Sequence, residues 1–176
     1  TGYGAFFAKN KGRQRLLWVP ANDGMLHAFN VTTGAEVFAY VPGALANRLV
    51  EIPLQRGTAA RTQLNGANFT AGVTETQPTG TVWPYVDGNP FTADVKVGSA
   101  SGEEWRTYLL GSLGRGGKGV YALDVSMSSD PLTVDPDASY LAESNATSIF
   151  KWQFTADDDA DLGYVTSDVA THPATN

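Results

Sequence analysis

Cysteine is absent from the sequence, and histidine is nearly absent. The 176 residues contain no Cys and two His, which are His27 and His172. The missing thiols exclude disulfide frameworks, thiolate zinc sites and cysteine nucleophiles. Two histidines this far apart give no metal-ligand spacing, and no Ser/His/Asp arrangement matches a known catalytic motif. We therefore predict that the chain is not an enzyme and that it acts by binding.

Long apolar runs are also lacking. No stretch of about 18 apolar residues occurs, so nothing in this sequence is expected to span a membrane. The sequence starts with Thr1 rather than Met and shows no signal peptide, and we interpret it as an excerpt of a longer protein. A missing targeting segment then says nothing about where the protein resides.

Basic residues are scarce in the second half of the sequence. Residues 1–70 contain seven Lys and Arg against three Asp and Glu, whereas residues 71–176 contain five against fifteen. Non-specific nucleic-acid binding needs clustered Lys and Arg, so we expect no nucleic-acid partner. The acidic half suits cation binding, although a solvated acidic surface explains the same composition equally well.

Short strand-forming runs dominate what is present. Three of them, separated by turn sequences, occupy residues 15–20, 25–30 and 36–41. The Asp23-Gly24 pair between the first two is a strong hairpin signal, because glycine accepts the positive φ that a tight turn requires. These runs predict an antiparallel meander of three strands.

A similar pattern recurs later in the sequence. Strand-like runs occupy residues 105–110, 120–125 and 149–154, and residues 83–97 also have strand character. Aligning the two meanders pairs residues 28–31 (AFNV) with residues 122–125 (ALDV), an offset of 94 residues. The offset corresponds to about two propeller blades or to one blade with an insertion, and we favour one blade with an insertion.

Short meanders, glycine-rich turns and internal repetition predict an all-β fold. We expect antiparallel four-stranded blades of a β-propeller, about two of them, with long loop insertions. The predicted organisation is a blade at 15–42, an insertion at 43–81, a blade at 82–154 and the start of the next blade at 155–176. The insertion is expected to contain a short helix at 44–50 and a long loop at 55–80.

Several stretches resemble known families. Residues 21–34 are similar to the quinoprotein-type propeller repeat, which marks the fold more than the function. A finer resemblance to the PilC/PilY family of type IV pilus adhesins rests on residues 17–29 (LWVPANDGMLHAF), 85–90 (YVDGNP) and 105–124 (WRTYLLGSLGRGGKGVYALD). Residues 161–164 (DLGY) resemble that family's entry into the next blade. Residues 51–80 and the tail after Tyr164 depart from the family pattern.

The resemblance to the PilC/PilY family implies a large secreted protein at the bacterial cell surface, at the pilus tip or the outer membrane. Its implied role is to support pilus assembly and adhesion, and thereby virulence. Pilins or minor pilins and a host or abiotic surface receptor are the implied partners, and calcium modulates some members. Two alternatives stay open, namely a quinoprotein dehydrogenase propeller and an outer-membrane assembly scaffold.

Each alternative has one sequence feature against it. A quinoprotein dehydrogenase is disfavoured because the sequence lacks adjacent cysteines and any recognisable set of cofactor contacts. An assembly scaffold is expected to have regular repeats and short loops, so the irregular insertion at 51–80 argues mildly against it.

An acidic run near the end is the best candidate for chemistry. The predicted Ca²⁺ ligands are Asp157, Asp159, Asp161, Gly163 and Asp168. They fall at positions 1, 3, 5, 7 and 12 of a calcium-binding loop, where alternate oxygens turn toward one hard cation. Leu162 stands where an EF-hand loop has glycine, and Asp168 is shorter than the usual Glu. A solvated acidic turn between blades is the alternative interpretation.

The remaining features receive structural interpretations. Residues 114–119 (GRGGKG) contain a dinucleotide-binding spacing, but a predicted strand follows instead of a helix, so we expect a hairpin turn. His27 is expected to be packed or hydrogen-bonded, and Asp23 and Asp87 to stabilise their turns. The tryptophans expected to pack between blades rather than to bind sugars are Trp18, Trp83, Trp105 and Trp152.

Overall fold

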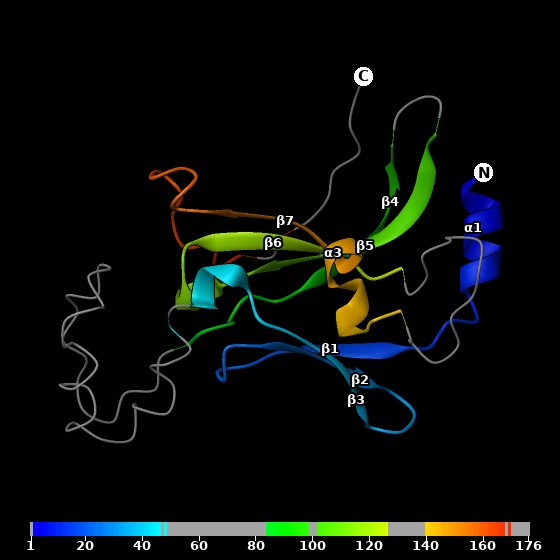
Figure 1. Cartoon of the computed structure of the whole chain (residues 1–176), viewed down its shortest axis with the longest axis horizontal. Coiled ribbons are helices and arrows are strands. Elements are labelled where there is room, and N and C mark those ends of the chain that lie inside the picture. The colour runs from blue at the N-terminus through cyan, green and yellow to red at the C-terminus, as the bar shows by residue number, and fades with distance from the viewer. Residues whose placement is uncertain are drawn as a thin grey trace.

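Two antiparallel β-sheets form the body of the molecule (Figure 1). The computed structural model describes residues 2–46, 48, 84–98, 102–126, 140–167 and 169. Most of the predicted insertion at 43–81 lies outside these residues, as do Trp83, Asp168 and His172. The predicted all-β class of antiparallel propeller blades is confirmed.

The first sheet is a three-stranded meander. Its strands, in spatial order, are β1 (Leu16–Pro20), β2 (Leu26–Asn30) and β3 (Glu36–Tyr40). Gly24 adopts a φ of 95° in the β1–β2 turn, where a side chain would be strained. Asp23 stabilises the same turn, because its Oδ1 accepts a hydrogen bond of 3.0 Å from the Met25 amide. The predicted hairpin is confirmed.

The second sheet has four strands. They pair in the order β4 (Phe91–Val97), β5 (Glu104–Ser112), β6 (Gly119–Asp124) and β7 (Phe150–Thr155). The strand predicted over 83–97 begins only at Phe91, because Pro84 and Pro90 cannot donate ladder hydrogen bonds. The other strands lie within two residues of their predicted ends.

Helical segments are short and lie at the margins of the sheets. They are α1 (Tyr3–Asn10), η2 (Gly114–Gly116), η3 (Glu143–Asn145) and α3 (Ala146–Ile149). The analysis of the sequence did not anticipate α1, whose Phe6 and Asn10 are buried on one side. The helix expected at 44–50 starts as a 3₁₀ turn over residues 43–46. No helix of the described residues is long and apolar enough to cross a membrane.

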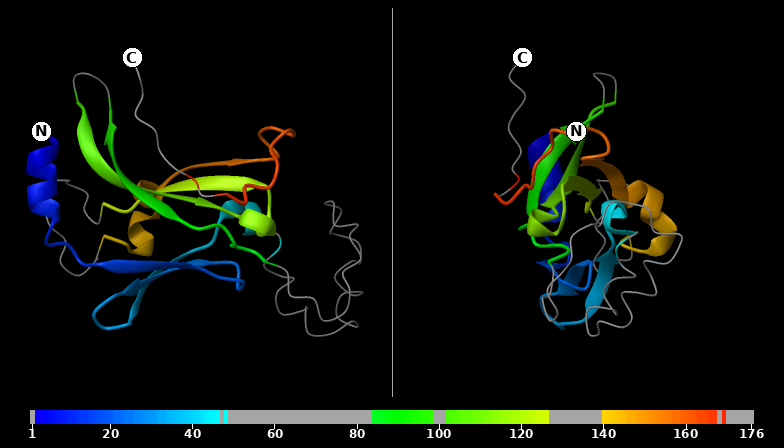
Figure 2. Two further views of the ribbon diagram at one scale, coloured as in Figure 1. Left: turned by 180° about the vertical axis from the view of Figure 1, so that it is seen from behind. Right: turned by 90° about the vertical axis from the view of Figure 1, so that its left-hand side faces the viewer.

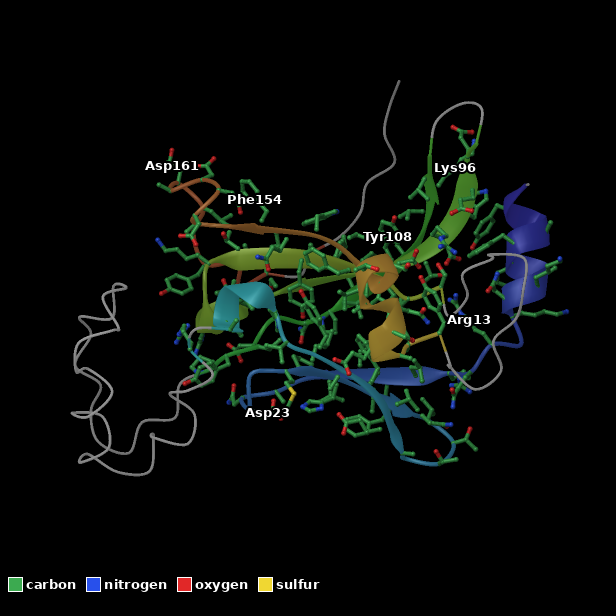
Figure 3. All side chains as sticks on the ribbon, in the orientation of Figure 1. Arg13, Asp23, Lys96, Tyr108, Phe154 and Asp161 are labelled. Atoms are coloured by element: carbon green, nitrogen blue, oxygen red, sulfur yellow. The ribbon has the colours of Figure 1, made fainter. Side chains whose placement is uncertain are left out.

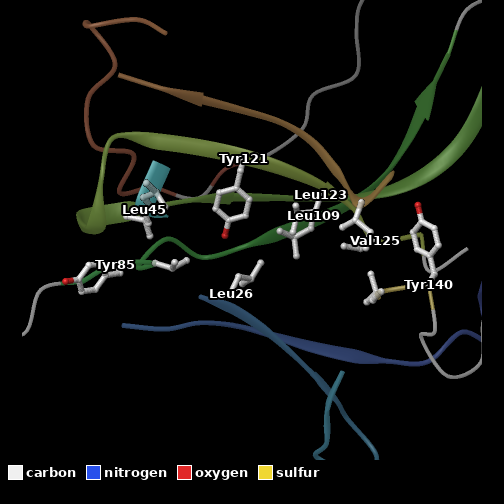
Figure 4. Close-up of a cluster of buried hydrophobic side chains, with 12 residues drawn as sticks. Leu26, Leu45, Tyr85, Leu109, Tyr121, Leu123, Val125 and Tyr140 are labelled. Carbon is white, nitrogen blue, oxygen red and sulfur yellow. The ribbon is translucent and has the colours of Figure 1, made fainter. Parts of the chain in front are cut away.

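The hydrophobic core lies between the two sheets. Leu26 of the first sheet and Leu109, Tyr121 and Leu123 of the second are fully or almost fully buried in one cluster. In Figure 4 the Tyr121 side chain points from the second sheet toward Leu26. The ring of Tyr40 lies 5.2 Å from that of Tyr121, which extends the contact to β3. Burial of these side chains from both sheets fixes one sheet against the other.

The two sheets share a bulge at the same place. Pairing of β2 with β3 shifts register between Ala28 and Phe29. Pairing of β6 with β7 shifts register between Ala122 and Leu123. These are the residues that the 94-residue offset equates, and both alanines are 0% exposed. A bulge increases local twist, so the two meanders carry the same bend.

Main-chain hydrogen bonds repeat with the bulge. The Val31 amide donates to the Arg15 carbonyl at 3.1 Å, and the Val125 amide donates to the Thr107 carbonyl at 2.8 Å. In the same way, a hydrogen bond from the Ala21 amide to the Met25 carbonyl links β1 to β2 at their turn. A hydrogen bond from the Leu113 amide to the Gly119 carbonyl links β5 to β6. The strands β1, β2 and β3 therefore correspond to β5, β6 and β7.

The two sheets correspond strand by strand, but they contact each other with non-corresponding faces. Trp18, Ala28 and Phe38 are cross-strand neighbours on the face of the first sheet that packs against the core. The second sheet meets them with the face that bears Leu109 and Tyr121. Because successive side chains in a strand alternate between faces, the other face of the second sheet remains outside this contact.

Candidate functional site

The turns that carry the sequence motifs gather at one end of the molecule. They are the β1–β2 turn, the β5–β6 turn and the acidic turn that follows β7 (Figures 1 and 2). Helix α1, the end of β4 and the start of β5 lie at the opposite end. Figure 3 places Asp23 and Asp161 at this motif-bearing end, which we call the turn end.

Main-chain hydrogen bonds tie the turns at this end together. The Val86 amide donates to the Ala21 carbonyl at 3.4 Å, and the Asp87 amide donates to the Leu113 carbonyl at 3.2 Å. The segment around Val86 and Asp87 therefore bridges the first hairpin and the glycine-rich turn. Stretches that lie far apart in the sequence form one connected surface.

Arg48 adds a side-chain connection to the turn end. Its guanidinium donates a hydrogen bond to the Gly116 carbonyl and lies 5.2 Å from the centre of the Tyr85 ring. Guanidinium groups bind carbonyl oxygens and stack on aromatic faces at the same time. No sequence motif around Arg48 could have identified this contact.

Glycine is required in the β5–β6 turn by close packing. Gly114 has a φ of 57°, which disfavours any side chain. A Cβ at Gly116 would overlap the backbone carbonyl of Tyr85. Strand β6 follows the turn, which contains only the three-residue 3₁₀ segment η2 rather than the start of an α-helix, so the predicted hairpin turn is confirmed.

The acidic turn after β7 is organised by its own carboxylates. Asp158 Oδ2 accepts hydrogen bonds from the Thr155 amide at 2.8 Å and the Thr155 hydroxyl at 3.0 Å. Asp159 Oδ1 accepts a hydrogen bond of 2.9 Å from the Asp161 amide. Asp158 thus supports the turn, although the sequence pattern had singled out its neighbours.

The predicted calcium ligands are only partly described by the structure. Asp157, Asp159, Asp161 and Gly163 are exposed in this turn, and Asp168 lies outside the described residues. Among the described residues, no three His, Cys, Asp or Glu side chains are gathered closely enough to hold a metal ion. Calcium binding therefore stays a prediction.

His27 lies between two carboxylates on the first sheet. Its Nδ1 is 2.6 Å from Glu36 Oε1, and its Nε2 is 2.8 Å from Asp23 Oδ2. The hydrogen bond to Glu36 is the main cause that raises the pKa of His27 above 6.5, and burial opposes it. The predicted role as a hydrogen-bonded structural histidine is confirmed.

Asp124 holds a buried ion pair at the end of β6. It is 0% exposed, and its Oδ2 lies 3.0 Å from Arg106 Nε and 3.6 Å from Lys151 Nζ. Its Oδ1 accepts a hydrogen bond from the Ser126 amide. The equivalent residue of the first sheet is Asn30, whose Oδ1 accepts hydrogen bonds from the amides of the following turn. Both positions support the turn after their strand.

Most of the sequence, including two of the three turns at the turn end, matches one known domain. The family model described as the PilY1 beta-propeller domain matches residues 1–142. The chain belongs to the PilY1 β-propeller family. The stretches that resembled PilC/PilY proteins are those that meet at the turn end, so the resemblance that the motifs indicated is confirmed.

The sequence aligns with PilY1 proteins of two bacteria over most of its length. It is 32% identical over 165 residues to the type IV pilus biogenesis factor PilY1 of Pseudomonas aeruginosa strain UCBPP-PA14, covering 94% of the chain and 11% of that protein. It is 39% identical over 129 residues to a PilY1 homolog of Xylella fastidiosa, covering 72% of the chain and 8% of that protein. The chain thus spans about a tenth of the length of these relatives.

A solved PilY1 structure has the same fold. The crystal structure of the Pseudomonas aeruginosa PilY1 C-terminal domain matches with a TM-score of 0.54 and 31% sequence identity. The match covers 95% of this chain and 24% of that domain. The chain therefore aligns with about a quarter of that solved chain.

The described tryptophans of this chain occupy different environments. Trp18 packs against the core, as predicted, with its ring 6.1 Å from that of Phe38. Trp105 lies beside Tyr3 of α1, with 4.8 Å between the ring centres. Trp152 is 44% exposed, so its predicted packing is not provided by the described residues.

Proposed function

We propose that this chain is a non-catalytic propeller section of a type IV pilus biogenesis factor at the bacterial cell surface. It supports pilus assembly together with pilins or minor pilins, and it supports adhesion to host or abiotic surfaces. Membership of the PilY1 family and the names of the relatives support the link to pili.

The observation that carries the proposal is the construction of the turn end. Two main-chain hydrogen bonds and the Arg48 contact hold turns from both sheets in one surface. A rigid β-scaffold that presents several connected turns is the usual design of a binding surface. In the described residues, the acidic turn at this end presents exposed carboxylates.

We propose further that calcium modulates this surface through the acidic turn. Asp157, Asp159 and Asp161 are exposed and close in sequence, so their mutual repulsion is relieved by a cation or by solvent. Asp158 anchors the turn through Thr155, and Asp159 Oδ1 accepts the Asp161 amide. The ligands proposed for calcium are therefore the exposed carboxylates of Asp157 and Asp161 and the second carboxylate oxygen of Asp159. The expected affinity lies in the micromolar to millimolar range.

The proposed location is tested by shearing pili from the source cells. Peptides of this chain, attached to a much longer polypeptide, are expected in the sheared fraction by mass spectrometry. Recovery only from the soluble periplasm, with pili intact, would contradict the pilus role. A cofactor absorbance on reconstitution of the longer polypeptide would instead support a quinoprotein dehydrogenase.

Calorimetry on the intact propeller tests the calcium proposal separately. We expect heat from calcium binding. We also expect Asp159→Asn to weaken the calcium affinity about tenfold or more, because one of the carboxylates at the site loses its charge. Glu143→Gln is the matched control, since it removes the same charge from an exposed position of η3 away from the turn. No calcium heat, or equal loss in both variants, would show that the turn is merely solvated.

A further inference from the structure

His27 is the centre of a small cluster that reaches the turn end. Its ring lies on β2, four residues after Asp23 of the β1–β2 turn, and faces Glu36, the first residue of β3. Nε2 is 2.8 Å from Asp23 Oδ2, and Nδ1 is 2.6 Å from Glu36 Oε1. Both ring nitrogens therefore face an acceptor oxygen.

Only the charged form of the ring satisfies both contacts. Imidazolium carries a proton on each nitrogen, whereas neutral imidazole carries a proton on one nitrogen only. A carboxylate opposite the unprotonated nitrogen then meets a lone pair at hydrogen-bonding distance. One of the two carboxylates must therefore leave the ring when His27 loses its proton.

The contact with Asp23 is the one that we expect to break. Glu36 makes the shorter contact, and its hydrogen bond is the main cause that raises the pKa of His27. The remaining proton is therefore expected on Nδ1, where it faces Glu36. The Asp23 side chain is 44% exposed, so water can receive its carboxylate when the ring releases it.

The two carboxylates determine the charge state of the ring. The neighbouring strands place uncharged side chains opposite His27, namely Val19 on β1 and Ala39 on β3. The charged groups that face His27 in the described part of the chain are Asp23 and Glu36, and Glu36 has the larger effect on its pKa. Protonation of the ring is thus coupled to these two contacts.

Asp23 connects the ring to the main chain of the turn. Its other oxygen, Oδ1, accepts a hydrogen bond of 3.0 Å from the Met25 amide. The Ala21 carbonyl closes the same turn by accepting the Gly24 amide at 3.4 Å, and it also accepts the Val86 amide at 3.4 Å. A change in the turn therefore reaches the segment that bridges the two hairpins.

We propose that His27 is a pH switch for the turn end. The imidazolium holds Asp23 in place and keeps the β1–β2 turn ordered against Val86, and loss of the proton frees Asp23 and loosens the turn. The ordered turn is fully favoured below pH 6.5, and that preference is lost as the pH rises through the raised pKa of His27. Control of binding by this switch rests on the function proposed for the turn end, whereas the change in the turn itself is independent of it.

Hydrogen exchange on the purified, full-length polypeptide measures the switch. Mass spectrometry with resolution of single amides gives the protection factors of Met25 and Val86, corrected for the intrinsic effect of pH, at about pH 6 and about pH 9. We expect both protection factors to fall about fivefold or more at the higher pH, as for the loss of about one hydrogen bond. Amides of β6 are the internal control and should keep their protection.

Three variants separate the switch from a general effect of pH. Glu36→Gln removes the competing carboxylate, so the neutral ring keeps its proton on Nε2 for Asp23 and the turn stays protected at both pH values. His27→Gln removes the titrating group, so protection no longer changes with pH. His172→Gln is the matched control, because it removes the only other histidine of the chain, and the pH step should remain.

Equal protection of the turn at both pH values in the unmodified protein would overturn the switch, and so would a pH step that survives in His27→Gln. Retention of the full-length polypeptide on sheared pili, measured at the same two pH values, tests the link to binding. We expect less retention at the higher pH and no such change for His27→Gln. A protection step that His27→Gln abolishes, together with retention that does not depend on pH, would uphold the switch and contradict the function proposed for the turn end.

Discussion

Asp124 is a residue whose charge is balanced entirely inside the fold. It is fully buried, and Arg106 and Lys151 lie within 4 Å of its carboxylate. Asp124→Asn keeps the shape but removes the buried charge that both Arg106 and Lys151 contact, so we expect a loss of about 3–5 kcal/mol in the free energy of unfolding. Denaturant unfolding of the propeller measures this loss.

Glu104 provides the matched control for this ion pair. It also contacts Arg106, at 3.2 Å, but its side chain is 44% exposed. Glu104→Gln is expected to cost less than about 1 kcal/mol, because solvent screens exposed pairs. Similar losses for the Asp124 and Glu104 variants would show that burial does not set the strength of the pair.

His27 makes the stability of the first sheet depend on pH. Its pKa is raised above 6.5, mainly by the hydrogen bond to Glu36, so the folded state favours the imidazolium. The stabilisation is fully present below pH 6.5 and is lost as the pH rises through the raised pKa. We expect the free energy of unfolding to fall over this interval, and His27→Gln to remove that part of the fall.

An NMR titration of the His27 ring tests the cause of the shift directly. We expect a pKa above 6.5 in the unmodified protein and a larger decrease for Glu36→Gln than for Asp23→Asn. The Glu36 variant is the cleaner probe, because Asp23 also binds the Met25 amide. A His27 pKa that is insensitive to both substitutions would show that the two carboxylates do not cause the shift.

At the scale of elements, the β5–β6 turn depends on a glycine that touches backbone. Gly116→Ala places a methyl group against the Tyr85 carbonyl, which cannot move aside like a flexible side chain. We expect a loss of about 1–3 kcal/mol, as for other overpacked sites. Gly102→Ala is the control, because nothing lies within 4 Å of the added Cβ. Thermal unfolding of both variants decides whether the contact matters.

Strands were predictable from the sequence because their signals are local. The Asp23-Gly24 turn fixes the first hairpin, and alternating apolar residues define the strands on both sides. Helix α1 escaped prediction, although Tyr3, Phe6 and Phe7 have helical spacing, because an eight-residue segment beginning next to glycines gives a weak signal. Only tertiary contact, seen in the burial of Phe6, stabilises it.

The candidate site was predictable only in part. Sequence spacing identified the acidic turn, but it could not reveal that Asp159 already accepts the Asp161 amide or that Asp158 anchors Thr155. Such hydrogen bonds depend on the conformation of the turn, and the spacing of the aspartates in the sequence does not determine that conformation. The convergence at the turn end joins Ala21 to Val86 and Asp87 to Leu113, and these long-range pairs leave no local pattern.

At the scale of the molecule, the second sheet carries an exposed aromatic face. Trp152 and Phe154 are 44% and 40% exposed. Their counterparts in the first sheet, Phe38 and Tyr40, pack against the core. The repeat predicts that Trp152 and Phe154 pack in the same way against the next blade of the longer polypeptide.

Trp152 fluorescence tests that packing. In the full-length polypeptide we expect Trp152 to resist quenching by acrylamide, and we expect Trp152→Ser to lower the melting temperature by several degrees. Gln153→Ser, at the exposed neighbouring position on the opposite face of the same strand, controls for the loss of β-propensity. Ready quenching of Trp152 in the full-length polypeptide would show that this face stays open to solvent.

The contact between the two sheets has a consequence for handling the chain by itself. This contact joins one face of the first sheet to a different face of the second sheet. If copies of the chain associate through these faces, each added copy again exposes an unpaired face, so the assembly does not close. A closed ring satisfies every such face within one polypeptide, whereas an isolated piece leaves one unsatisfied at each side. Light scattering of the chain by itself should therefore rise with concentration as head-to-tail polymers form, whereas closure of several blades into a ring would leave no face free to polymerise.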